Sequence, residues 1–307
     1  MKTAYVFVVA AVSGCAADPM PVDPTDDDPS EFVATPNGFY HRDCVIDVGE
    51  NASIDEDSVT LADNSRMEIP TCQHAHYATR AQIGQIQPRF ECGDRGDAVC
   101  GWKAWTEKDA QVWWKETSAS WSVPPEPTHF EAGDDTVYMF PDLQNSFTIV
   151  QPVLQYGPSP AGGSAFWSIG AWDCENAPGT CLHSTLSIVY VGHKLSGYAK
   201  GTSCTSAGVC TWSIHIQDNS APGVAQTFTH HEAAKMTRAD VALETYGIEQ
   251  CADLPASGAE AFAVTLIGSS GKTSTAGWTA HKGPYATGCN EHASSVGNAH
   301  AYLYWND

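Results

Sequence analysis

Two uncharged amides lie among apolar neighbours in residues 146–157, Ser-Phe-Thr-Ile-Val-Gln-Pro-Val-Leu-Gln-Tyr-Gly. The alternation of β-branched and aromatic residues predicts a strand, which places Gln151 and Gln155 on one face together with Val153. An amide side chain in that setting needs a hydrogen-bond partner, so it is either satisfied within the fold or available to a ligand. From this stretch alone, a satisfied strand glutamine is the simpler interpretation.

Other residues have the types that bind metals or act in hydrolases. The run Cys72-Gln-His74-Ala-His76 could bind a metal, but the sequence has no paired Cys-x-x-Cys spacing that would complete a zinc site. The adjacent His230 and His231 would point to opposite sides of a strand. A hydrolase set around a serine lacks the Gly-x-Ser-x-Gly elbow. We therefore predict no metal site and no cofactor.

The cysteines predict a disulfide framework. The chain has eleven cysteines, and ten remain once Cys15 is set aside. An even number in an exported chain indicates disulfides, although metal binding is the alternative. Three pairs are close in sequence and flank loop residues: Cys92–Cys100, Cys174–Cys181 and Cys204–Cys210. Elimination leaves Cys44–Cys72 and Cys251–Cys289.

The elements that must position these residues are short strands. Turn residues (Gly, Pro, Asp and Ser) recur roughly every 8–15 residues from residue 118 onward, without a long helical period. This spacing favours a β-sandwich or jelly roll of two antiparallel sheets over an α/β fold. We predict strands at residues 119–123, 136–140, 147–156, 166–172, 186–191, 195–200, 211–217, 225–230, 241–248, 261–267 and 299–305.

Residues 32–117 form a predicted small N-terminal region stapled by two disulfides, ahead of a sandwich at 118–307. Large aromatics are more often core than exposed, so the tryptophans that bridge the two regions are expected in the core or at an interface. They are Trp102, Trp105, Trp113, Trp114 and Trp121. Residues 106–115 are compatible with either a short helix or a strand.

Residues 1–15 have the features of a lipoprotein leader. Lys2 precedes an apolar run too short to span a bilayer, and Val-Ser-Gly-Cys15 has the small residues of a lipobox. An ordinary signal peptide cleaved nearby is the alternative. Residues 16–31 are rich in Pro and Asp, which predicts an extended tether. We expect an exported protein anchored by a lipid on Cys15 to the bacterial outer membrane or the cell surface.

The net charge of −21 disfavours nucleic acid and anionic membranes as partners. Contact with a membrane is therefore expected only through the lipid anchor.

Several segments in the same order resemble the eqolisin-type glutamic peptidases, with plant neprosin proteins as more distant relatives. The family has an Ile-Leu-Gln-Thr-Gly strand, matched here to Ile149-Val-Gln151-Pro, and an Ala-Glu-Trp-Ile strand, matched to Leu243-Glu244-Thr-Tyr246. A preceding Trp-Ser-Val-Pro-Pro run from Trp121 and a following aromatic run at residues 166–172 extend the likeness. It covers roughly residues 118–307.

The resemblance implies a sandwich of two curved sheets and a catalytic pair on one concave sheet. The implied pair is Gln151 and Glu244, since a carboxylate exchanges a proton with water and an amide supports the oxyanion. Asp142 matches the family's aspartate, and Tyr138 stands where the family has tryptophan. Trp167, Trp172 and Tyr246 are further predicted substrate-binding residues.

The chain departs from the family pattern at three places. Ala171 stands where the family has a glutamate, and Gly192-His193 replaces a Gly-Asp turn. Pro152 directly follows Gln151 and cannot donate to a strand ladder.

Two functions follow from these observations. The first is an endopeptidase acting on extracellular protein or peptide, with Glu244 as base and acid. The alternative is a non-catalytic module that binds glycan or surface polymer, with Trp167, Trp172, Tyr156 and Trp212 along a groove. A glycosidase is weaker, because the sequence lacks the paired carboxylates on one strand that such sandwich enzymes carry.

Overall fold

The computed structural model describes residues 27–55, 57–78, 83, 101–131, 135–175, 179–232, 235–283 and 288–306. The predicted leader and most of the tether lie outside these residues, as does the predicted Cys92–Cys100 disulfide. Among the described residues, no helix is long and apolar enough to cross a membrane.

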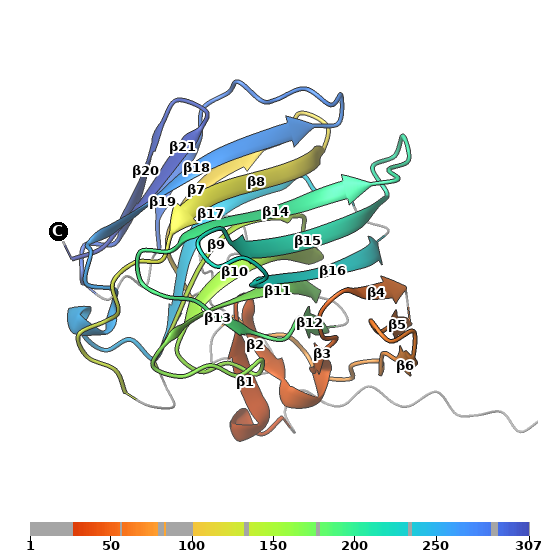
Figure 1. The fold of residues 1–307 in the computed structure, drawn as a ribbon, viewed down its shortest axis with the longest axis horizontal. Coiled ribbons are helices and arrows are strands. Elements are labelled where there is room, and N and C mark those ends of the chain that lie inside the picture. Colours follow the sequence, from red (N-terminus) through yellow and green to blue (C-terminus); the bar gives the residue numbers. More distant parts are fainter. Residues whose placement is uncertain are drawn as a thin grey trace, which may run out of the picture.

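The described chain folds into two stacked β-sheets (Figure 1). The first has nine strands, of which β13 (Ser187–Ile188) lies off the main order and pairs with β11. The others follow the order β19 (Thr279–Lys282), β7 (Trp102–Asp109), β17 (Arg238–Tyr246), β9 (Thr136–Gln144), β10 (Thr148–Tyr156), β11 (Trp167–Glu175), β12 (Cys181–His183) and β3 (Val45–Asp47). Neighbouring strands are antiparallel except for β12 and β3.

The second sheet has ten strands. Their order is β20 (His292–Val296), β21 (His300–Tyr304), β18 (Ala259–Gly268), β8 (Trp114–Ser122), β14 (Lys194–Thr202), β15 (Cys210–Asp218), β16 (Ala225–Glu232), β4 (Ala52–Asp55), β5 (Ser58–Thr60) and β6 (Arg66–Glu68). Strands from the N-terminal region thus extend both sheets at one edge.

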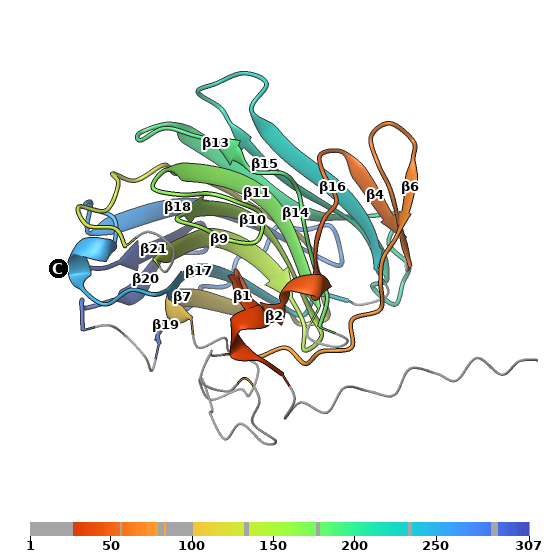
Figure 2. The same ribbon diagram turned by 90° about the horizontal axis from the view of Figure 1, so that it is seen from below.

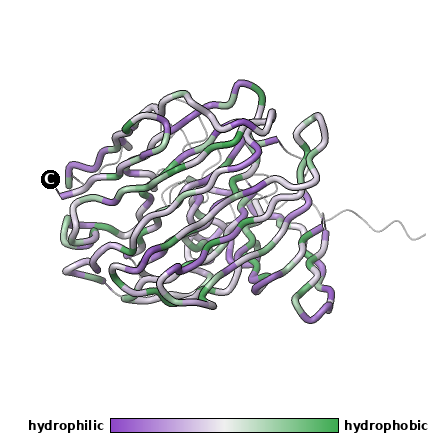
Figure 3. Tube along the Cα trace, turned by 45° about the horizontal axis from the view of Figure 1, so that its top comes forward, coloured by the Kyte–Doolittle hydropathy of each residue, from purple (hydrophilic) through white to green (hydrophobic). Residues whose placement is uncertain are grey.

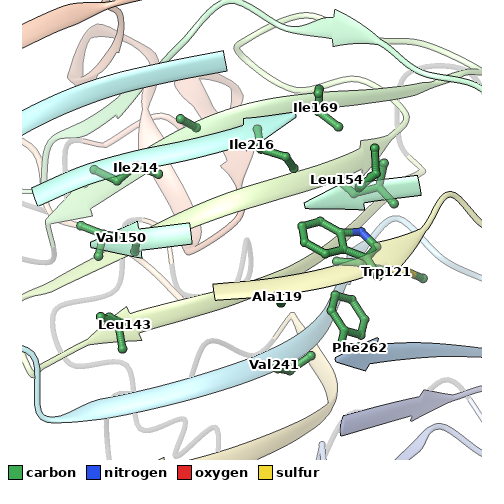
Figure 4. Packing of buried hydrophobic residues seen from close by; sticks show 14 of the residues in the cluster. Ala119, Trp121, Leu143, Val150, Leu154, Ile169, Ile214, Ile216, Val241 and Phe262 are labelled. Carbon is green, nitrogen blue, oxygen red and sulfur yellow. The ribbon is translucent and has the colours of Figure 1, made fainter. Parts of the chain in front are cut away.

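The main core lies between the two sheets and follows the strand period of two. Val150 and Leu154 of β10 face Ile214 and Ile216 of β15 in this cluster (Figure 4). Hydrophobic and hydrophilic positions alternate along many strands, as Figure 3 shows. Strand β15 has one buried and one partly exposed face, which is the pattern of a sheet with one face toward water.

Strand β10 differs, because all nine of its residues are buried. Its second face therefore needs a cover, and the cover is the N-terminal hairpin of β1 (Phe32–Thr35) and β2 (Gly38–His41). In Figure 2 this hairpin lies beside β9 and β17, on the side away from β14 and β15. We call this covered side of the nine-stranded sheet the outer face.

The all-β sandwich predicted from the sequence is confirmed, with some changes of detail. Residues 106–115 contain no helix; they span the end of β7 and the start of β8. The predicted strand at 186–191 is reduced to the two residues of β13. Four predicted disulfides are present: Cys44–Cys72, Cys174–Cys181, Cys204–Cys210 and Cys251–Cys289. Cys72 is therefore a disulfide partner, as the sequence predicted.

Candidate active site under the N-terminal hairpin

Gln151 lies on the outer face, because it shares the strand period of Ile149 and Val153 rather than that of the inter-sheet core. Its side chain is fully buried. Its Nε2 donates to the carbonyl oxygen of Pro36 over 2.7 Å. The Nε2 donor of the amide therefore binds a peptide carbonyl, whereas its Oε1 acceptor has no partner among the described residues.

Glu244 lies on the same outer face, on β17, and is also fully buried. Trp102 donates its indole N–H to Oε2 over 3.1 Å, and Tyr246 donates its hydroxyl to Oε1. Burial raises the pKa of Glu244 to about 8, against opposing contributions from these two donors, the Gly38 N–H and the Lys103 charge. Burial therefore favours the protonated form of this carboxyl.

The turn Pro36-Asn37-Gly38 connects the two predicted catalytic residues. Gln151 donates to the carbonyl of Pro36, and the backbone N–H of Gly38 lies near enough to the carboxyl of Glu244 to lower its pKa. The structure thus brings both side chains onto one three-residue segment of backbone, although they lie on different strands.

Two predicted substrate-binding tyrosines contact the same hairpin. Tyr138 donates its hydroxyl to the carbonyl of Ala34 over 3.3 Å. The ring of Tyr246 packs edge-on against Phe39 with centroids 5.0 Å apart. The hairpin therefore covers the candidate site with both backbone and side-chain contacts.

Gln155 is a candidate that the sequence reasoning did not select. On the outer face, Glu244 pairs with Tyr138 across β17 and β9, and Tyr138 pairs with Gln155 across β9 and β10. Gln155 Nε2 donates to the carbonyl oxygens of Gly157 (2.7 Å) and Gly162 (3.0 Å), while Oε1 lacks a described partner. The signal was present, since Val-Leu-Gln-Tyr-Gly at 153–157 also matches the Ile-Leu-Gln-Thr-Gly pattern.

The remaining predicted site residues are dispersed. Trp172 lies opposite Gln151 on β11 and belongs to the outer-face cluster. Trp167 packs with Tyr156 between the two sheets, with ring centroids 5.1 Å apart. Asp142 lies opposite Asp240 and not opposite Glu244.

A cavity of about 600 Å³ adjoins the candidate site at one end of the hairpin. The hairpin contributes Phe32 and Phe39 to its wall, and the sandwich contributes Tyr246. Glu131 and Glu249 also line it, so its polar part is acidic.

One cluster has metal-ligand residue types. Ligand atoms of His129, Asp135 and Asp253 lie within 4.8 Å of one another. The carboxylate of Asp253 already accepts from the backbone N–H groups of Glu249 and Gln250 and contacts His129 Nδ1 at 2.6 Å. These contacts account for Asp253 as an anchor between two loops, without an ion.

The structure therefore defines an all-β sandwich in which a carboxyl and an amide on one sheet bind a peptide segment. No family model matches the chain, and no curated protein matches it.

Among solved structures, the chain is similar to eqolisin-family glutamic peptidases. A scytalido-glutamic peptidase with a peptide-based transition-state analogue is 13% identical, with a TM-score of 0.48. That match covers 66% of this chain and 98% of the peptidase. SCP-B, an eqolisin-family member in complex with the tripeptide Ala-Ile-His, is also 13% identical, with a TM-score of 0.45 over 66% of this chain and 98% of that one.

Proposed function

We propose that this protein is a glutamic-type endopeptidase whose site is closed by its own N-terminal hairpin. One observation carries the proposal: a backbone turn of the chain accepts a hydrogen bond from Gln151 and lies beside the buried carboxyl of Glu244. A surface that holds a peptide carbonyl with an amide next to a carboxyl has the two kinds of group that peptide hydrolysis can use.

The proposed reaction uses these two side chains when a substrate replaces the turn. Glu244 as carboxylate takes a proton from a water molecule, whose oxygen attacks the carbonyl carbon. The amide of Gln151 donates to the carbonyl oxygen and stabilises its developing negative charge without adding a charge of its own. Glu244 then returns the proton to the leaving nitrogen as the C–N bond breaks.

The hairpin blocks this reaction in two ways. It fills the space that a substrate backbone would occupy, and it keeps water from the carboxyl of Glu244. Because burial is the main cause of the raised pKa, removal of the hairpin should hydrate Glu244 and return its pKa toward the ordinary range. The opened site then has the carboxylate that the reaction requires.

The proposed setting is outside the cytoplasm, because disulfides persist in oxidising compartments and four are present. A lipid on Cys15 is proposed to anchor the chain, with extracellular protein or peptide as the substrate. No described feature favours the glycan-binding alternative. Its four aromatic side chains, Trp167, Trp172, Tyr156 and Trp212, are at most 4% exposed.

The proposal is tested by cleavage of a denatured protein mixture between acid and neutral pH. The full chain, its Glu244→Gln variant and a variant with a loosened hairpin are compared. Cleavage that increases with loosening and disappears with Glu244→Gln supports the proposal. If neither the full chain nor the loosened variant cleaves at any pH, the peptidase function is wrong.

A further inference from the structure

Asp142 and Asp240 face each other directly across β9 and β17. Both lie on the outer face, and both are fully buried. Like charges directly opposite in an antiparallel pair are destabilising, and a buried charge has an additional desolvation cost. Two ionised carboxylates at this position would oppose the strand pairing that the structure shows.

The groups around this pair donate to only two of its four carboxyl oxygens. Gln144 Nε2 donates to Asp240 Oδ2 over 2.8 Å and lies 3.4 Å from Asp142 Oδ1. Arg238 Nε donates to Asp240 Oδ2 over 3.2 Å. The other two oxygens, Asp142 Oδ2 and Asp240 Oδ1, are buried and have no donor among the described residues.

We propose that Asp142 and Asp240 share one proton, which joins them in a carboxyl–carboxylate hydrogen bond, and that this pair positions β9 and β17 for the proposed reaction. A single proton removes the repulsion and satisfies both orphaned oxygens. Arg238 balances the one negative charge that remains. Glu107, opposite Asp240 on β7, adds a negative charge on the other side and favours retention of the proton.

The direction of the pKa shifts agrees with this geometry. Burial first, and the Asp240 charge second, raise the pKa of Asp142 well above its usual range. Burial raises the pKa of Asp240 to about 7, opposed by Arg238 and supported by Glu107. Both carboxyls therefore favour the protonated form in an acid medium.

The pair connects to the candidate site through strand register. Four residues along the same two strands from the pair of Asp142 and Asp240 lies the cross-strand pair of Tyr138 and Glu244. The β9–β10 register is the same on either side of Pro152 and places Gln151 opposite Asp142. Loss of the shared proton would place two negative charges opposite each other on β9 and β17, the strands that carry Tyr138 and Glu244.

The proton itself can be observed by NMR titration of the aspartate side-chain carboxyl carbons in the full chain. We expect one carboxyl of the pair to stay protonated about 3 pH units above the ordinary aspartate value of about 4. The Asp142→Asn variant has a neutral amide that can donate to Asp240 Oδ1, so this late titration should disappear. Complete ionisation of both aspartates by pH 6 in the wild type would overturn the proposal.

A stability measurement gives an independent test. A carboxyl whose pKa is raised to about 7 contributes stability that is lost as pH rises from about 4 to 7, and Asp142→Asn should reduce the slope of the unfolding free energy in that range by about one proton. Asp218→Asn removes another buried carboxylate, one on the other sheet that contacts His193, and is the control for loss of a buried carboxylate away from the pair. An unchanged slope in Asp142→Asn, or stabilisation of the wild type by calcium that a chelator reverses, would contradict a shared proton.

The positioning role rests on the proposed peptidase function, whereas the shared proton does not. If the wild type cleaves, Asp142→Asn should extend the upper pH limit of cleavage to higher pH. An upper pH limit identical to the wild type would refute the positioning role. If the titration is seen but the wild type cleaves nothing, the peptidase function fails and the proton-sharing pair stands.

Discussion

The side-chain amide of Gln151 holds the carbonyl oxygen of Pro36, 115 residues earlier in the chain, at 2.7 Å. This contact makes the N-terminal hairpin a tethered ligand of the outer face. A tethered segment acts at an effective concentration on the order of millimolar, so an external peptide competes poorly while the hairpin is docked. Measurements on this protein should therefore separate the chemistry of the site from its closure.

Replacement of Glu244 by glutamine should abolish cleavage while the fold is kept. The amide retains the shape of the carboxyl but cannot accept the proton of water, and loss of such a group costs roughly 10²–10⁴ in rate. The measurement is turnover of a denatured substrate by wild type and variant, with the hairpin loosened in both.

The matched control for this variant is Glu260→Gln. Glu260 lies on β18 of the other sheet, where it accepts the backbone N–H of Ser122 over 3.0 Å. Burial raises its pKa to about 7. It therefore tests the loss of a second carboxyl with a raised pKa that lies away from the site. Equal activity of Glu244→Gln and wild type would exclude Glu244 as the base.

Gln151→Ala and Gln155→Ala together decide which amide supports the oxyanion. Gln151 already donates to a peptide carbonyl, whereas Gln155 donates to the backbone of its own loop at Gly157 and Gly162. We expect Gln151→Ala to lower kcat by on the order of 10²–10³. Gln155→Ala should mainly lower stability, by about 1–3 kcal/mol, because it leaves loop carbonyls without their donor.

The opposite result would assign support of the oxyanion to Gln155 instead of Gln151. If Gln155→Ala loses turnover at unchanged stability while Gln151→Ala keeps it, then the amide that pairs with Tyr138 in the row of Glu244 is the functional one. Thermal unfolding of each variant separates the two cases.

Local sequence pattern was sufficient for most of the sandwich. Alternation along residues 211–217 predicted β15, because one face of that strand meets the core and the other meets solvent. The same reasoning could not decide whether the end of β7, within residues 106–115, forms a helix or a strand. All residues of this strand from Trp102 to Lys108 are buried, including Lys103 and Glu107, so no alternation of polar and apolar residues marks it. Buried charges depend on tertiary neighbours, and no period along the chain records them.

The arrangement of the site depended on strand register over long separations. The sequence placed Gln151 and Gln155 on one face, but only the pairing of β9 with β10 shows which of them lies in the row of Glu244. Residues 38–41 have the composition of an ordinary short strand. Nothing local indicates that they dock on strands more than 100 residues later.

Gly38→Ala should release the hairpin without a change in the proposed catalytic residues. Gly38 has a φ of +98°, and an added Cβ would lie 2.6 Å from His76 Nε2 and 2.7 Å from the carbonyl oxygen of Tyr77. The strained backbone alone costs roughly 1–3 kcal/mol. We expect faster hydrogen exchange in β1 and β2 and increased cleavage.

Gly49→Ala is the control for backbone strain. Gly49 also has a positive φ, of +70°, but an added Cβ would meet nothing within 4 Å. The control should leave hairpin exchange and cleavage near wild type. If Gly38→Ala frees the hairpin and cleavage still does not rise, then the hairpin is not what limits activity.

Acid should weaken the docking of the hairpin through its histidines. His76 Nε2 contacts the carbonyl of Asn37 in the docked turn, and burial lowers the pKa of His76 to about 4. His41 stacks on His74 with ring centroids 3.5 Å apart, and burial, with His74 second, lowers the pKa of His41. A lowered histidine pKa contributes stability above about pH 6.5 that is lost as pH falls toward 4.

For His76 this loss is at most roughly 3 kcal/mol, because the shift from 6.5 to about 4 spans two to three pH units and the ring keeps some exposure. Glu244 acts in the opposite direction, because the docked hairpin raises its pKa to about 8, so protonation of this carboxyl stabilises docking as pH falls. The histidine contribution is therefore the difference between the wild type and His76→Gln in the hydrogen-exchange protection factors of β1 and β2, which correct for the intrinsic pH effect. Between pH 6.5 and 4 we expect the protection of the hairpin to rise more, or fall less, in His76→Gln than in the wild type, whereas the exposed His300→Gln should follow the wild type. An identical pH response in His76→Gln and the wild type would exclude this contribution of His76.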